Sequence, residues 1–149
     1  MMFVLPIHTA HAVTFMAAID QSKWEVEASQ FFCRLEQIVP SYGIARFSRE
    51  AGEKAVFQLL PTQKGSLSGK VKLVAEASAW QPGMSPELIG VVNMKEGERQ
   101  VNVKSDYAGE MLVSLYHGMS PTFTMAGWMG TNEVLRVGLS AANFQKSYN

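Results

Sequence analysis

The sequence predicts a mainly β domain, a β-rich α+β fold made of an antiparallel sheet or a barrel-like structure with one or two helices packed on it. Three observations support this prediction. Apolar and polar residues alternate with period two along most of the chain, turn residues separate the alternating runs, and one segment changes to the helical period. With 149 residues, the chain is long enough for one domain with its own hydrophobic core.

Period-two alternation predicts the strands, because successive side chains of a strand point to opposite faces of the sheet. Charged or polar residues separate the apolar ones in each run, which is typical of half-buried antiparallel strands. The residues predicted to face the core are Trp24, Val26, Ala28, Phe31, Cys33, Leu35, Val71, Leu73, Ala75, Ala77, Val101, Val103, Leu135, Val137 and Leu139.

Turns are predicted where Gly, Pro, Ser or Asn-like polar residues interrupt the apolar runs. These turns are expected at residues 29–30, 40–43, 51–53, 64–66 and 96–98. Residues 80–86 contain two prolines and a glycine, which cannot continue a strand ladder. We therefore expect an irregular loop there, between two halves of the sheet.

Residues 105–117 predict a helix. Apolar residues recur there at helical spacing, at Tyr107, Ala108, Met111, Leu112 and Leu115. Ser105 is expected to cap the first turn, and Gly118 is expected to end the helix. A second, short helix is predicted after Ser140, where the alternation is lost.

Residues 1–12 are similar to the end of a secretory signal peptide. Met1–Ile7 is apolar, and Ala10-His11-Ala12 has the small-x-small pattern that signal peptidase accepts. No Lys or Arg precedes the apolar stretch, so the predicted signal is incomplete, and residues 13–149 are expected to form the mature domain. The alternative is a buried strand that begins near Phe3. His8 has only His11 as a nearby second ligand, so no metal site is expected.

Composition excludes several classes of function. The 13 basic residues balance the 13 acidic ones, and no basic run is present, which argues against nucleic-acid binding through phosphate contacts. No apolar run reaches the roughly 18 residues of a membrane-spanning helix. No glycine-rich phosphate loop is present, so no nucleotide cofactor is expected.

The sequence also predicts no enzyme. A nucleophile needs an adjacent base, and the pairing of Cys33 with His117 is the arrangement to consider. Cys33 lies on an apolar strand face, where a thiol is inert or disulfide-bonded, and His117 ends the predicted helix, where it suits the helix dipole. Acidic residues such as Glu76, Glu87 and Asp106 show no spacing typical of a catalytic pair.

Large adaptable side chains are the candidate binding residues. Trp80 lies on the predicted irregular loop, and four more form a glycine-containing stretch, namely Met119, Met125, Trp128 and Met129. Met and Trp are enriched in interface cores, but they also fill the core of a small β-rich domain. Either these residues pack inside the domain, or they form an interface near Met119–Gly130.

A series of short motifs is similar to the N-terminal domain of the MotY family, accessory proteins of the polar flagellar motor. The resemblance covers Trp24–Asn149. Its motifs, in chain order, are Lys23-Trp24-Glu25-Val26, Cys33-Arg34-Leu35, Pro40-Ser41-Tyr42-Gly43, Ala45-Arg46-Phe47, Trp80-Gln81-Pro82-Gly83, Gly118-Met119-Ser120-Pro121-Thr122-Phe123 and Asn143-Phe144-Gln145-Lys146-Ser147-Tyr148-Asn149.

The resemblance implies a periplasmic, non-enzymatic protein with a β-rich fold. It also implies docking on the flagellar basal body together with MotX, in a ring that supports incorporation of the ion-driven stator. In the family an OmpA-like domain follows and binds peptidoglycan, and this chain stops before it. We therefore expect no peptidoglycan binding by this chain alone.

The resemblance implies a role for the single cysteine as well. Cys33 matches the first cysteine of the family, whose disulfide partner is expected beyond Asn149. An alternative function is a periplasmic carbohydrate- or peptidoglycan-binding module, in which exposed Trp80 and Trp128 would stack on sugar rings.

Overall fold

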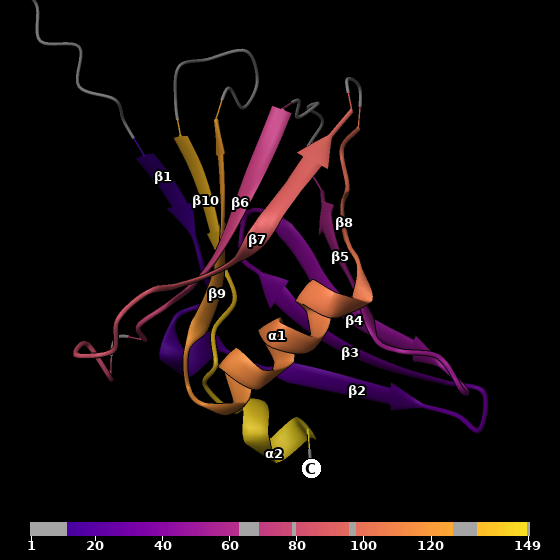
Figure 1. The fold of residues 1–149 in the computed structure, drawn as a ribbon. Helices are drawn as coiled ribbons and strands as arrows, with labels where there is room; N and C mark the ends of the chain where they lie inside the picture. The colour runs from indigo at the N-terminus through magenta and orange to yellow at the C-terminus, as the bar shows by residue number, and fades with distance from the viewer. Residues whose placement is uncertain (1–11, 63–68, 79, 96–97, 127–133, 149) are drawn as a thin grey trace, which may run out of the picture.

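The computed structural model describes residues 12–62, 69–78, 80–95, 98–126 and 134–148 (Figure 1). In chain order its elements are β1 (Ala12–Phe15), the 3₁₀ helix η1 (Ile19–Gln21), β2 (Trp24–Ala28), β3 (Phe32–Val39), β4 (Gly43–Glu50), β5 (Val56–Pro61), β6 (Gly69–Glu76), β7 (Glu87–Met94), β8 (Val101–Val103), α1 (Ser105–Tyr116), β9 (Ser120–Ala126), β10 (Val134–Gly138) and α2 (Phe144–Tyr148).

The strands form two five-stranded sheets. Sheet A has the order β1-β10-β9-β6-β7, and sheet B has the order β2-β3-β4-β5-β8. Every pairing is antiparallel except that of β1 with β10, which is parallel. Figure 1 shows the strands of the two sheets running in different directions. The predicted β-rich α+β fold is confirmed, as two open sheets and not as a closed barrel.

The core lies between the inner faces of the two sheets. The rings of Phe57 in sheet B and Phe123 in sheet A stack with centroids 5.5 Å apart and planes 13° apart. Helix α1 adds Ala108, Met111 and Leu115, all buried. In Figure 1, α1 lies in front of the sheets and α2 lies beside β2. Aromatic packing of this kind holds the sheets together and excludes water.

The predicted inner faces are confirmed in the later strands. Val71, Leu73, Ala75, Val101, Val103, Leu135, Val137 and Leu139 are buried. The prediction is wrong in part for the β2–β3 hairpin: Val26 is 49% exposed, Phe31 is 68% exposed and Ala28 is also exposed, while Trp24 and Leu35 are buried. The hairpin extends past the helix and sheet A (Figure 1), so these inward positions are only partly covered.

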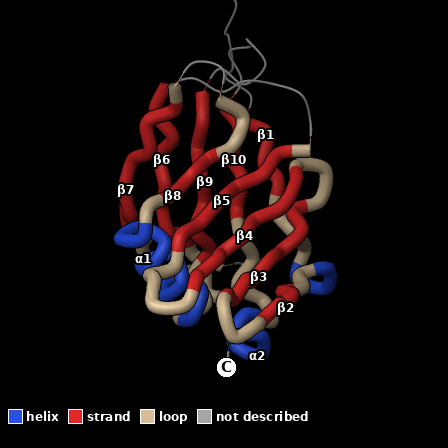
Figure 2. The backbone as a smooth tube through the Cα atoms, turned by 90° about the vertical axis from the view of Figure 1, so that its right-hand side faces the viewer, coloured by secondary structure: helices blue, strands red, loops and turns tan. Residues whose placement is uncertain are grey.

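The outer face of sheet B carries a polar row that crosses all five strands. Glu25, Glu36, Arg46, Gln58 and Asn102 are neighbours in register from β2 to β8. The Arg46 Nε donates a hydrogen bond to the Glu36 carboxylate at 2.7 Å. Figure 2 shows this sheet with the helices at its margins. The row explains why this face faces solvent, because burying its charges would cost more than their pairing returns.

A buried glutamine joins β3 to the segment before α2. Gln37 is 1% exposed and lies on the inner face, two residues beyond Leu35. Its amide nitrogen donates to the Ser22 hydroxyl at 3.0 Å and to the Ser140 carbonyl at 3.1 Å. Its amide oxygen accepts from the Ser140 N–H at 2.9 Å. The Ser140 carbonyl also accepts a hydrogen bond from the Trp24 indole. The polar groups of Gln37 and Ser140 in this network therefore each have a partner.

The helix ends differ in one respect from expectation. Lys104 occupies the N-cap position of α1 without a side-chain hydrogen bond, and Ser105 is the first helical residue, so the predicted Ser105 cap is wrong. Gly118 has φ +82° and ends the helix as predicted. Helix α2 confirms the second predicted helix.

Most predicted connections agree with the structure. Residues 29–30, 40–42 and 51–53 lie in the turns between successive strands of sheet B, and Gly43, the last residue of the predicted turn 40–43, begins β4. Residues 80–86 have no helix or strand, but they join β6 to its neighbour β7 in sheet A and do not separate two halves of a sheet. The turn at 64–66, part of the turn at 96–98 and the predicted signal residues 1–11 lie outside the described residues.

Gln37→Leu is expected to lower the free energy of unfolding by about 3 kcal/mol, because it leaves the buried Ser140 N–H without an acceptor and removes the hydrogen bonds from the Gln37 amide to Ser22 and Ser140. Chemical denaturation measures this loss. The matched control is Gln58→Leu on the outer face, which should change stability by less than about 0.5 kcal/mol. Equal stability of the two variants would show that the network contributes nothing.

Tyr42 supplies a prediction about pH. Its side chain is 3% exposed, its hydroxyl has no hydrogen-bond partner among the described residues, and burial raises its pKa to about 12. An unfolded tyrosine titrates near pH 10, so between pH 10 and 12 the unfolded state loses this proton first. Stability then falls with rising pH, by about 2.7 kcal/mol across the window. Tyr42→Phe should remove that loss.

The measurement is denaturant unfolding of the wild type and Tyr42→Phe at pH 9, 10, 11 and 12, because lysine titration affects both proteins alike. Above pH 10, the free energy of unfolding of Tyr42→Phe should rise steadily relative to that of the wild type. A difference between the two proteins that stays constant from pH 9 to 12 would contradict burial as the cause.

Candidate functional site

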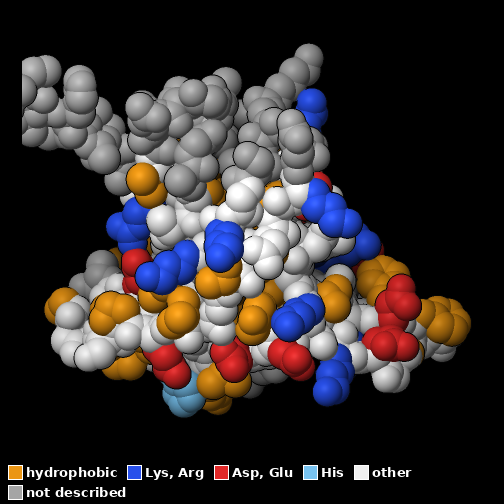
Figure 3. All heavy atoms as spheres, turned by 45° about the horizontal axis from the view of Figure 1, so that its top comes forward, with side chains coloured by type: hydrophobic (Ala, Val, Ile, Leu, Met, Phe, Trp, Pro, Cys, Tyr) orange, Lys and Arg blue, Asp and Glu red, His pale blue; other side chains and the backbone are white. Residues whose placement is uncertain are grey.

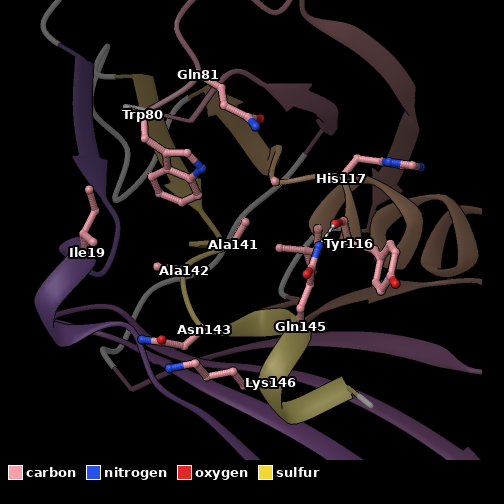
Figure 4. Close-up of a pocket in the computed structure, with 12 residues that line it drawn as sticks. Ile19, Trp80, Gln81, Tyr116, His117, Ala141, Ala142, Asn143, Gln145 and Lys146 are labelled. Atoms are coloured by element: carbon pink, nitrogen blue, oxygen red, sulfur yellow. Dashed lines mark hydrogen bonds between the residues drawn. The ribbon is translucent and has the colours of Figure 1, made fainter.

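A surface groove of about 630 Å³ lies where the two chain ends meet the irregular loop (Figure 4). We call it the Trp80 groove. Its lining comes from η1, the loop after β6, the end of α1, the segment that leads into α2 and α2 itself. The lining residues are Ile19, Trp80, Gln81, Leu115, Tyr116, His117, Gly118, Ala141, Ala142, Asn143, Gln145 and Lys146.

Large apolar side chains stay exposed around this groove. Trp80 is 44% exposed, Ile19 is 54% exposed and Tyr116 is 42% exposed. In Figure 4 the Trp80 indole lies between Ile19 on one side and Ala141 on the other, with Ala142 below the indole. Exposed apolar residues that gather at one depression mark an interaction site more often than scattered ones do.

Hydrogen bonds hold the lower side of the groove in place. The Asn143 side-chain amide donates to the Ser22 carbonyl at 3.0 Å, and the Ser22 hydroxyl donates to the Ala142 carbonyl at 2.8 Å. The Gln145 amide donates to the Tyr116 carbonyl at 2.7 Å, which occupies one of the free carbonyls at the end of α1. The segment 141–145 is therefore held by hydrogen bonds to Ser22 and to the end of α1 in the ligand-free protein.

The charge of the groove is cationic. Lys146 and His117 are the basic residues of the lining, and none of its twelve residues is Asp or Glu. The Lys146 ammonium makes no ion pair with the described residues. In Figure 4 Lys146 lies at the lower rim, whereas the His117 ring points away from the centre. Elsewhere charges of both signs are interspersed with apolar side chains, as on the face in Figure 3.

The predicted interface residues separate in the structure. Trp80 lines the groove, as an interface residue should. Met119 and Met125 are 6% and 2% exposed and pack in the core, so neither is available to a partner on the folded surface. Trp128 and Met129 lie outside the described residues. Sequence reasoning missed Ile19 and Lys146, because the groove brings together segments more than a hundred residues apart.

Cys33 and His117 lie in different depressions. Cys33 lines a second pocket of about 350 Å³ with Val26, Leu35 and Leu112, whereas His117 lines the Trp80 groove. The structure thus does not bring together the pair that a thiol nucleophile would need.

The disulfide implied for Cys33 stays a prediction. Glu76 is occupied by an ion pair with Arg136, and the described residues contain no group of three or more potential metal ligands.

Comparison with known proteins gives two matches. The family profile described as "MotY N-terminal domain" matches residues 15–149. A curated protein of Vibrio parahaemolyticus serotype O3:K6 (strain RIMD 2210633), named "Sodium-type flagellar protein MotY", is 30% identical over 139 residues. The alignment covers 91% of this chain and 47% of the relative, so the chain spans about half the relative's length. No helix among the described residues is long and apolar enough to cross a membrane.

Gly118→Ala tests the end of α1 that borders the groove. At φ +82° an alanine is strained, and its Cβ would lie 3.0 Å from the Gln81 Oε1. We expect a loss of about 1–2 kcal/mol in thermal or denaturant unfolding. The matched variant is Gly109→Ala inside α1, where nothing beyond the adjacent residues and the helix's own backbone lies within 4 Å of the added Cβ, and it should gain about 0.5–1 kcal/mol. Changes of the same sign in both variants would contradict this geometry.

Proposed function

Because the chain belongs to the MotY N-terminal domain family, we propose that it is a component of a bacterial flagellar motor that acts by docking onto other proteins. One structural observation carries the docking part of this proposal. Trp80, Ile19 and Tyr116 remain exposed around one groove, although a domain of this size has a core in which to bury them. Aromatic side chains placed in this way are typical anchors of protein interfaces.

The proposal includes the partners and the location. The chain docks on the flagellar basal body together with a MotX-like protein, in the periplasm, and the resulting ring supports incorporation of the stator. The relative's name, which refers to a sodium-type flagellar protein, supports a place in the motor. The chain spans about half of that relative, so these roles of the whole protein are proposed for this part of it.

The proposed role is non-catalytic. Two observations support it: Cys33 and His117 line different pockets, and Glu76 is engaged by Arg136. A rigid β-rich body with exposed anchors at one groove can position partners without chemistry of its own.

A carbohydrate-binding module is the second candidate, and the exposed Trp80 indole is the observation that favours it. Indole rings stack on sugars as readily as they anchor a protein partner. Murein sacculi therefore serve as the alternative ligand in the experiment that follows.

Co-sedimentation tests the proposal. Basal bodies isolated from cells that lack this protein are mixed with the purified chain, with and without the MotX-like protein, and centrifuged. We expect the chain to pellet with basal bodies, and more of it when the MotX-like protein is present. With murein sacculi alone we expect the chain to stay in the supernatant.

Two results would overturn the proposal. The first is a chain that remains in the supernatant with basal bodies whether or not the MotX-like protein is added. The second is a chain that pellets with sacculi and is released by soluble glycan fragments, which would establish the carbohydrate-binding function instead. A melting curve of the sample, taken before mixing, shows that the chain is folded.

A further inference from the structure

We propose that the Trp80 groove binds an extended segment of a partner protein in which an apolar side chain lies next to a carboxylate. The inference rests on the proposed function, because it names the chemistry that docks at the same domain. It goes beyond that function by assigning the contact to one groove and one kind of peptide.

The apolar side chain of the segment has a defined binding site in the groove. Trp80, Ile19, Ala141 and Ala142 all line the groove, and the small alanine side chains leave room beside and below the indole (Figure 4). A groove of about 630 Å³ is large enough for one aliphatic or aromatic side chain together with the backbone that carries it. Covering the half-exposed indole would supply much of the binding free energy.

The polar part follows from the donors that the groove leaves free. The Trp80 indole N–H has no hydrogen-bond partner among the described residues, and the Lys146 ammonium has no ion pair there. Both groups donate and cannot accept. Among the described residues, the lining contains no carboxylate that could satisfy them. An incoming carboxylate beside a backbone carbonyl would match these two donors in charge and in hydrogen bonding.

A nearby acidic residue does not reverse this charge. Asp20 follows Ile19 on η1 and is exposed, but it is not part of the lining. The C-terminal end of α1 carries partial negative charge, but its last carbonyls already accept hydrogen bonds from the backbone N–H groups that follow the helix and from the Gln145 amide. The favourable position for a carboxylate is therefore the Lys146 side of the groove, away from the helix end.

A protein segment fits the groove better than a sugar does. Sugar hydroxyls need both donors and acceptors around the ring, and side-chain amides usually supply them. Here one amide N–H of Asn143 and one of Gln145 are already committed to the Ser22 and Tyr116 carbonyls, which leaves Gln81 as the further amide of the lining. These bonds also hold the groove in shape, which lowers the entropic cost of binding a peptide.

The first experiment measures basal-body binding of variants of the whole chain. Trp80→Ala should weaken binding about tenfold or more, as expected for a central aromatic anchor. Lys146→Glu should weaken it severalfold, whereas Lys146→Arg should retain it. The matched control is Lys70→Glu, an equal change of charge at an exposed position on β6 in sheet A, which should bind as the wild type does.

The second experiment identifies the occupant. A photo-crosslinking phenylalanine, p-benzoylphenylalanine, replaces Trp80, the loaded basal bodies are irradiated, and the crosslinked peptide is sequenced by mass spectrometry. We expect one partner peptide with Asp or Glu within about three residues of the crosslinked apolar side chain. Placed at Lys70, the same probe should give no such peptide.

The outcomes separate this inference from the function on which it rests. If the wild type does not bind basal bodies, the proposed function fails. If the wild type binds and Trp80→Ala and Lys146→Glu bind equally well, the docking function stands and the groove is not its site. A crosslinked peptide rich in Lys or Arg, or an adduct with glycan only, would also overturn the inference.

Discussion

The buried amide of Gln37 is the interaction on which the rest of the structure depends. It lies on the inner face of β3, and it can be buried only because the Ser140 backbone and the Ser22 hydroxyl satisfy it. These bonds fix where residues 140–143 run, and Ser22 fixes them again through Ala142 and Asn143. The lower side of the Trp80 groove is the surface of this same segment. A polar network inside the core thus determines the shape of a groove outside it.

Much of the fold was predictable from the sequence because alternation reports burial directly. The inner faces of β6, β8 and β10 follow the pattern residue by residue. Alternation does not report which strands pair, so neither the parallel pairing of β1 with β10 nor the division into two sheets could be predicted. It also assumes that every apolar face is covered, which fails at Val26 and Phe31, where the hairpin extends past its neighbours.

The candidate site was predictable only in part, for a related reason. Trp80 was identified because an aromatic residue beside a proline-rich loop stands out in the sequence. Ile19 and Lys146 carry no such signal, since each is ordinary in its own segment and becomes notable only when the fold brings the segments together. Met119 and Met125 have the composition of an interface, but they lie on β9 or directly before it, in the core. Composition alone cannot distinguish these two places.

The bonds that join the two ends of the chain also determine when the domain becomes complete. The Ser22 hydroxyl and the Ala142 carbonyl are 120 residues apart in sequence, and the indole of Trp24 reaches across 116 residues to Ser140. Contacts between such distant residues close very long loops, so they form late and make folding slow. The groove therefore forms only when nearly the whole chain has folded. The proposed partner would therefore find its groove only on molecules in which the two ends of the chain have come together.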